Sequence, residues 1–230
     1  MSISDDMAPP SRWRRTVEFA GVVPRLANSI GHLGPRGPVG GPPALVVPGF
    51  LATDRTTLAL RRALADAGFR VHPWGMGPNM GARADTIDRL VARLAAFEAP
   101  VLLVGWSLGG LYARELARAA PGKVRAVVTL GSPFSGDPRA NNVWRLYEWI
   151  AGHSVDSPPI ARDSAKPPVP TLALWSRRDG IVAPAAARGL PRESDRAVEL
   201  ACGHMAFGVS RRAGRAVVRE IDSFLKMVEG

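Results

Sequence analysis

Short unbroken apolar runs alternate along this chain with segments in which apolar residues recur every three or four positions. The unbroken runs predict a strand buried on both faces at 44–47 and further strands at 101–104, 125–130 and 171–175, together with strands at 69–74 and, shorter, near 198–200. The periodic segments predict helices within 54–68, 87–94, 108–120 and 217–228, the first with Asp54 as its N-cap. Strands separated by helix-length segments pair in parallel, so we expect a doubly wound α/β fold with a mostly parallel sheet of about six strands.

Two segments fall outside this alternation. Residues 1–43 end in a Pro/Gly-rich stretch and predict an N-terminal arm and linker, which leaves 44–230 as the folded domain. Residues 134–169 separate two strands and are too long for a simple connection, and they contain one apolar helical face. Insertions beyond the carboxyl ends of parallel strands tend to build caps over a binding site. We therefore expect a helical cap there; a surface helix packed only for stability is the alternative.

Composition narrows the classes of protein that fit this pattern. The chain has 230 residues, 46% of them hydrophobic, which is enough for a substantial core. Its single cysteine, Cys202, cannot form an internal disulfide, and no apolar run is long enough to span a bilayer, so we expect a cytoplasmic protein. The net charge is +10, but the basic residues are dispersed and run together only in pairs. This dispersal favours solvated surfaces over a nucleic-acid-binding face.

The strand at 101–104 runs directly into the sequence Gly105-Trp106-Ser107-Leu108-Gly109, which matches G-x-S-x-G. The pattern alone is a modest signal, but here it falls on a strand-to-helix junction, where a sharp turn would lift a serine hydroxyl above the sheet. At a helix N-terminus, free backbone N–H groups and the helix dipole would also stabilise an oxyanion. Ser107 is therefore the candidate nucleophile.

A serine hydroxyl needs a base and a carboxylate that orients the base. His204 follows the last predicted strand and Asp179 follows the strand at 171–175, so both would reach the same sheet edge as Ser107. A structural histidine and an ordinary Asp-Gly turn are the alternatives. Less suitable candidates are His32 in the arm, His72 in a strand, His153 in the insertion, and the carboxylates of Asp137, Asp156 and Asp163.

These residues, in the order Ser107, Asp179, His204, make residues 44–229 resemble the α/β-hydrolase superfamily, in its lipase and esterase branch. The resemblance implies an oxyanion hole from two backbone N–H groups. They would come from Phe50, in a Pro-Gly-Phe sequence where relatives commonly have His-Gly, and from Leu108, with Leu51 as the fallback for Phe50. Ser132, in a Gly-Ser-Pro junction that lipase-like members share, is interpreted as a turn residue rather than a second nucleophile.

The resemblance implies ester hydrolysis through an acyl-enzyme, without a metal or other cofactor. We expect a small-molecule or lipid-like ester as substrate, with a pocket and cap formed by Leu51, Trp144, Tyr147 and Met205. Acyl transfer or thioester hydrolysis by the same triad is the alternative reaction, and a non-catalytic binding protein on this fold is the alternative class. A further alternative is that the basic arm around Trp13 makes weak peripheral contact with an anionic membrane, although one short arm rarely anchors a protein stably on its own. The sequence leaves the oligomeric state open.

Overall fold

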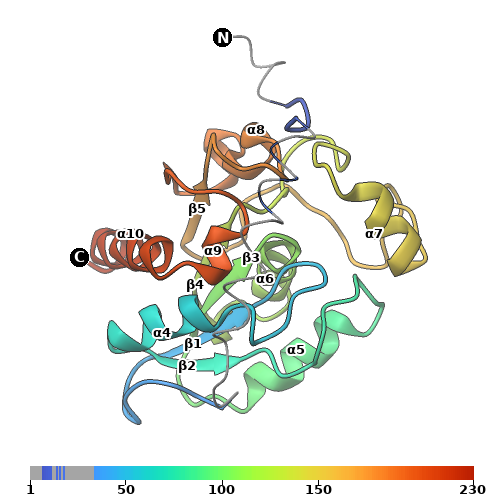
Figure 1. Ribbon diagram of the computed structural model, residues 1–230. Coiled ribbons are helices and arrows are strands. Elements are labelled where there is room, and N and C mark those ends of the chain that lie inside the picture. Colours follow the sequence, from blue (N-terminus) through green and yellow to red (C-terminus); the bar gives the residue numbers. More distant parts are fainter. Residues whose placement is uncertain (1–6, 12–13, 15, 17, 19–33) are drawn as a thin grey trace.

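A single six-stranded parallel sheet forms the centre of the computed structural model, which describes residues 7–11, 14, 16, 18 and 34–230 (Figure 1). The strand order is β2-β1-β3-β4-β5-β6, with every neighbouring pair parallel. The strands are β1 Pro43–Val47, β2 Arg70–Pro73, β3 Val101–Trp106, β4 Val124–Leu130, β5 Thr171–Trp175 and β6 Arg196–Glu199. The expected doubly wound α/β fold with six principal strands is confirmed.

Helices cover both faces of this sheet because alternate strand residues point to opposite sides. On one face, Val46 and Val104 pack with apolar residues of α4 and α10; on the other, Leu45 and Leu103 pack with α5 and α6. The helices are α4 Leu58–Asp66, α5 Thr86–Ala95, α6 Leu108–Ala119, α7 Trp144–Ala151, α8 Pro184–Arg188, α9 Ala206–Val209 and α10 Arg211–Glu229, with 3₁₀ turns at Pro121–Lys123 and Pro191–Glu193.

The predicted N-cap of the first helix is wrong. Helix α4 begins at Leu58, with Thr57 as the residue before it. The Asp54 carboxylate instead accepts hydrogen bonds from the backbone N–H groups of Trp74 and Gly75, at 2.8 and 3.1 Å. Asp54 is almost fully buried, and these two bonds tie the loop after β1 to the end of β2.

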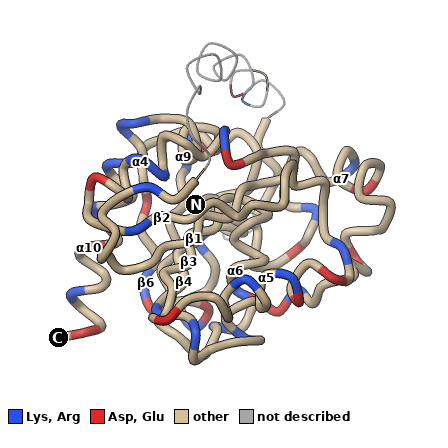
Figure 2. The backbone as a smooth tube through the Cα atoms, turned by 90° about the horizontal axis from the view of Figure 1, so that it is seen from below, with Lys and Arg blue, Asp and Glu red and all other residues tan. Residues whose placement is uncertain are grey.

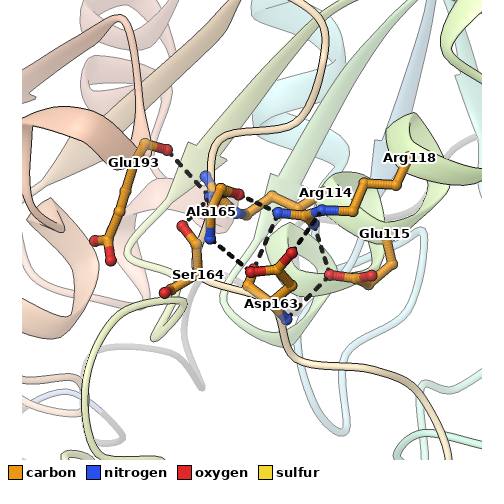
Figure 3. A network of polar contacts seen from close by, with 7 residues as sticks. All are labelled: Arg114, Glu115, Arg118, Asp163, Ser164, Ala165 and Glu193. Atoms are coloured by element: carbon orange, nitrogen blue, oxygen red, sulfur yellow. Dashed lines mark hydrogen bonds and ion pairs between the residues drawn. The ribbon is translucent and has the colours of Figure 1, made fainter.

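The segment 134–169, called the cap from here on, contains helix α7 and an irregular return. Figure 3 shows how part of that return is fastened to α6: Arg114 and Arg118 of the helix donate hydrogen bonds to backbone carbonyls of the cap. Arg114 Nη2 also donates to the Glu193 carbonyl at 3.1 Å. The Arg114 guanidinium is buried and stacks over the Phe134 ring.

The described part of the N-terminal arm lies against the domain rather than apart from it. Met7 packs on the apolar cluster of Ala140 and Trp175, and Asn142 donates a hydrogen bond to the Pro10 carbonyl at 2.6 Å. Charge is dispersed: Figure 2 shows Lys and Arg around the whole outline of the fold, with acidic residues among them. Within the described ranges, no helix combines the length and apolar character needed to cross a membrane.

Candidate active site

Ser107 lies in a strained turn between β3 and α6. Its backbone has φ 54° and ψ −122°, in a region that only glycine usually occupies. The adjacent glycines make this turn sterically feasible. A Cβ at Gly105 would overlap the backbone of Gly109 and Gly110, and a Cβ at Gly109 would overlap the Val47 carbonyl. The G-x-S-x-G pattern therefore has a structural cause here, because backbone occupies the space where either side chain would lie.

Gly110 is a third glycine that the turn requires, although it lies outside the pattern. A Cβ at this position would overlap the Ser132 hydroxyl. Ser132 is completely buried, and its hydroxyl has no hydrogen-bond partner in the described part of the chain. This placement agrees with a packing role at the turn, because a nucleophile has to be reachable by substrate.

Asp179 and His204 form a buried, hydrogen-bonded pair in the loops that follow β5 and β6. His204 Nδ1 lies 2.7 Å from Asp179 Oδ2, and the two side chains are 4% and 1% exposed. The other carboxylate oxygen, Oδ1, accepts the backbone N–H groups of Ile181 and Val182, both at 2.8 Å. These three partners hold the Asp179 carboxylate in one orientation, so the carboxylate fixes the imidazole with Nε2 left for a different partner.

The pKa of His204 is raised above the ordinary histidine value. Burial of the ring acts in the opposite direction and lowers it, but the charge and hydrogen bond of Asp179, together with the charge of Glu18, outweigh burial. The imidazolium form is therefore favoured in this site, which is the form that results when the ring takes a proton from a neighbour.

Gly131 and Trp106 connect the strained turn to the Asp179–His204 pair. Ser107 N–H donates to the Leu130 carbonyl at 2.9 Å, and the next residue, Gly131, lies so close to the Asp179 carboxylate and the His204 ring that a Cβ would contact both. The Trp106 indole N–H donates to the His204 carbonyl at 3.1 Å. Within the described residues, no hydrogen bond joins the Ser107 hydroxyl to His204; such bonds commonly tighten only when substrate binds.

Two backbone N–H groups near Ser107, one in the loop after β1 and one at the start of α6, are without a hydrogen-bond partner among the described residues. They are the N–H groups of Phe50 and Leu108. Leu51, the fallback donor, is occupied: its N–H donates to the Asn79 carbonyl at 2.7 Å, and its φ is 58°. The Asn79 side chain also donates to the Pro48 carbonyl at 2.8 Å, so it holds the loop that presents Phe50.

A largely apolar cleft opens beside Ser107. Trp144 and Tyr147 of the cap line it, together with Phe50, whose ring meets the Tyr147 ring edge-on at 5.1 Å. The remaining lining residues are Ala82, Leu108, Leu111, Tyr112, Pro133, Pro138, Asn141, Val143, Val155, Pro158, Ile160, Ala161, Arg162 and Val182.

Two residues expected at the pocket lie outside this lining. Leu51 is 44% exposed because the turn at positive φ directs it to the surface. Met205 packs against the core on the α10 side of the sheet instead. From the turn after β1 only Phe50 reaches the cleft, and most of the remaining apolar surface comes from the cap and from α6.

The other histidines have structural surroundings. The His153 ring lies 3.1 Å from the Ala82 carbonyl and 3.4 Å from the Tyr147 hydroxyl, and so ties the cap to the loop before α5. His72 lies in β2 with its ring edge-on to Phe97. His32 lies outside the described residues. Among the residues that the structure describes, no cluster of His, Cys, Asp and Glu has the arrangement of a metal site.

Sequence reasoning missed two residues of this region, Glu18 and Asn79. Asn79 stands in a loop rich in glycine and proline, and Glu18 lies in the arm, far in sequence from the residues it contacts. Neither is part of a periodic pattern or motif. Their contacts are long-range, so only the folded arrangement of loops reveals them.

Comparisons with known proteins identify the fold. No protein-family model matches the chain. The pimeloyl-[acyl-carrier protein] methyl ester esterase of Cronobacter sakazakii is 45% identical over 60 residues, which are 25% of this chain and 23% of that protein. The chain thus matches less than a quarter of that relative's length.

Solved structures match over most of the chain. An α/β-hydrolase enzyme from the sediment metagenome of the Mar Chica lagoon in Morocco has a TM-score of 0.60 and 22% identity, over 85% of this chain and 94% of that one. Carboxylesterase CesB from Bacillus subtilis has a TM-score of 0.58 and 15% identity, over 92% and 98%. The chain has the α/β-hydrolase fold, as the sequence resemblance implied.

Proposed function

We propose that this protein is a serine hydrolase that cleaves carboxylic esters through an acyl-enzyme on Ser107. The observation that carries the proposal is the buried Asp179–His204 pair, with a 2.7 Å contact, at the same sheet edge as a serine held at positive φ. An isolated structural histidine would need neither the strained serine nor the unengaged amides beside it.

In this mechanism His204 Nε2 removes the proton from the Ser107 hydroxyl as the oxygen attacks the ester carbonyl carbon. Asp179 accepts the Nδ1–H bond, so it selects the tautomer and stabilises the imidazolium. The N–H groups of Phe50 and Leu108 receive the negative charge that develops on the carbonyl oxygen. His204 then returns the proton to the alcohol as the ester C–O bond breaks and the acyl-enzyme forms. Water attacks the acyl-enzyme with His204 again as the base, and the acid leaves as Ser107 regains its proton.

The cleft favours an ester with an apolar acyl or alcohol part. Aromatic and aliphatic side chains such as Trp144, Tyr147, Leu111 and Ile160 form most of its wall. The curated relative from Cronobacter sakazakii is named for a methyl ester on an acyl chain, which is compatible with an elongated apolar acyl group in such a cleft. We infer medium-length acyl esters as the substrate class.

The test is hydrolysis of p-nitrophenyl esters of increasing acyl length by the wild type and by Ser107→Ala. The substitution removes the attacking oxygen, so turnover should fall by a factor on the order of 10⁴, with the thermal unfolding midpoint unchanged. A fluorophosphonate probe should label the wild type at Ser107 only. Activity that survives in Ser107→Ala would end the proposal.

Adding a competing alcohol distinguishes hydrolysis from acyl transfer, because a transferase would deliver most of the acyl group to the alcohol.

A further inference from the structure

Glu18, from the N-terminal arm, binds the two loops that carry the Asp179–His204 pair. Its Oε1 accepts the backbone N–H of His204 at 2.5 Å and that of Gly180 at 3.2 Å, and its Oε2 accepts the N–H of Met205 at 3.1 Å. One carboxylate therefore joins the residue after Asp179 to His204 itself. Charge-assisted bonds of this kind are among the stronger hydrogen bonds in proteins.

Both loops have a glycine where the Glu18 side chain lies. A Cβ at Gly203 would overlap the Glu18 carboxylate, and a Cβ at Gly180 would overlap its side chain and the Arg14 backbone. Gly180 and Gly203 have no left-handed φ, so backbone conformation does not require glycine at either position. The space that they leave is filled by the arm, which is a second and independent sign that the arm is part of this site.

We propose that Glu18 is a positioning residue of the active site, whose carboxylate holds the Asp179 and His204 loops together and adds a second negative charge beside the imidazole. This inference rests on the proposed function, because it assigns Glu18 to the same reaction. Glu18 contacts neither Ser107 nor the cleft, so it acts through His204 and not on the substrate.

The charged groups around His204 support this role. Asp179 faces the ring from the loop after β5, and Glu18 faces its backbone from the arm. Cys202 lies two residues away, but burial and the charges of Asp179 and Glu18 raise the pKa of its thiol to about 12, so it is neutral. The rings of Trp106 and Phe207, which also pack near this loop, carry no charge.

Other arm contacts keep Glu18 in place. The Arg14 guanidinium donates to the Arg177 carbonyl at 2.9 Å, in the loop that precedes Asp179. Together with the Pro10 and Met7 contacts described above, it fastens the arm along the carboxyl edge of the sheet. Because these contacts link the arm to the catalytic loops, the activity should depend on a segment outside the sheet and helices of the domain.

The experiment compares Glu18→Gln and Glu18→Asp with the wild type in the full chain, measuring kcat and KM separately across a pH series. Glu18→Gln keeps the size but removes the charge and replaces one of the two acceptor oxygens with an NH2 donor, so kcat should fall by about tenfold while KM stays within about twofold. The acid limb of the pH profile should also move to lower pH, since a negative charge near the imidazole has gone. Glu18→Asp keeps the charge and should hold the limb in place.

Glu199→Gln is the matched control. It removes the same charge from the end of β6, where Glu199 pairs with Arg177 at 2.7 Å and has no contact with His204. Wild-type kcat and an unmoved acid limb in Glu18→Gln, with Ser107→Ala inactive, would overturn the Glu18 inference and leave the proposed function standing. Equal changes in Glu199→Gln would also overturn it, because the effect would then be general surface charge. Retained activity in Ser107→Ala would overturn the proposed function itself.

Discussion

The turn that carries Ser107 and the cap that covers the cleft are held in place by different means. The turn depends on backbone: all six residues of β3 are buried, and Gly105 and Gly109 let main chain lie directly against main chain. The cap depends on side chains, chiefly Arg114, Tyr147 and Arg162, that bind backbone carbonyl or N–H groups. Main-chain packing tolerates almost no change, whereas single side-chain ties can be lost one at a time. We call the Ser107 turn and the Asp179–His204 pair the frame. In the proposed mechanism the frame has to keep its geometry, whereas the cap residues that line the cleft can vary.

The largest expected effect comes from a change in that frame. Gly109→Ala places a Cβ against the Val47 and Pro48 carbonyls, so the turn has to move. We expect loss of activity by a factor of about 10³ or more and a lower unfolding midpoint, because displacement of the nucleophile and its amides removes both attack geometry and oxyanion binding. Gly122→Ala is the control, since a Cβ there meets nothing within 4 Å. Ester hydrolysis and thermal unfolding measure both effects, and an active Gly109→Ala would contradict the steric account.

The next effect concerns the main tie of the cap (Figure 3). Arg114→Met keeps an apolar side chain of similar length but leaves the carbonyls of Ser164, Ala165 and Glu193 without this donor. Loss of three hydrogen bonds from a charged donor, one of them to the carbonyl of the buried Glu193, should lower the free energy of unfolding by about 2–3 kcal/mol. Chemical denaturation measures this, and limited proteolysis should cleave the loosened return of the cap sooner.

Arg89→Met is the control for that change. Arg89 is half exposed, with one long ion pair to Asp85 at 3.8 Å, so its loss should cost less than about 0.5 kcal/mol. If Arg114→Met were as stable as Arg89→Met, the buried guanidinium would not be what fastens the cap to α6.

The pH dependence should report on the frame rather than on the cap. In the proposed mechanism His204 acts as a base only when it is unprotonated. Its pKa is raised, because the charge and hydrogen bond of Asp179 and the charge of Glu18 outweigh the lowering by burial. The value of kcat/KM should therefore fall as pH drops through a limb above the ordinary histidine value of about 6.5, by about tenfold per pH unit below it. A profile of kcat/KM against pH checks this, and a limb below the ordinary value would contradict the assigned surroundings of His204.

The sequence was informative where chemistry follows from local geometry. The six strands, the turn at Ser107 and the placement of Asp179 and His204 after successive strands follow from hydrophobic runs and from residues adjacent to them. The carboxyl ends of parallel strands lie at one sheet edge, so sequence order becomes spatial proximity. This logic reaches Asp179, which lies four residues after the end of β5.

Local patterns fail where a side chain bonds across long sequence distances. Asp54 looks like an N-cap but stabilises the end of β2, and Leu51 looks like a pocket residue until its positive φ directs it outward. Glu18 and His204 are 186 residues apart in sequence, and no periodicity links them. Such contacts depend on how loops pack after the sheet has formed, which single-residue propensities do not encode.

The smallest expected effect separates the two regions most sharply. The Tyr147 hydroxyl accepts the Ala82 N–H at 3.1 Å and lies 3.4 Å from His153, while the ring lines the cleft. Tyr147→Phe keeps the ring and removes only this tie, so KM should rise by about two- to threefold as the cap loosens, with kcat within about twofold. Trp149→Phe on the same helix is the control, because Trp149 is 80% exposed and outside the cleft. The acid limb should stay where the wild type has it, since none of the groups that surround His204 has changed. A shift of the acid limb in Tyr147→Phe would show that the cap affects the surroundings of His204. The cap and the frame would then not be independent of each other.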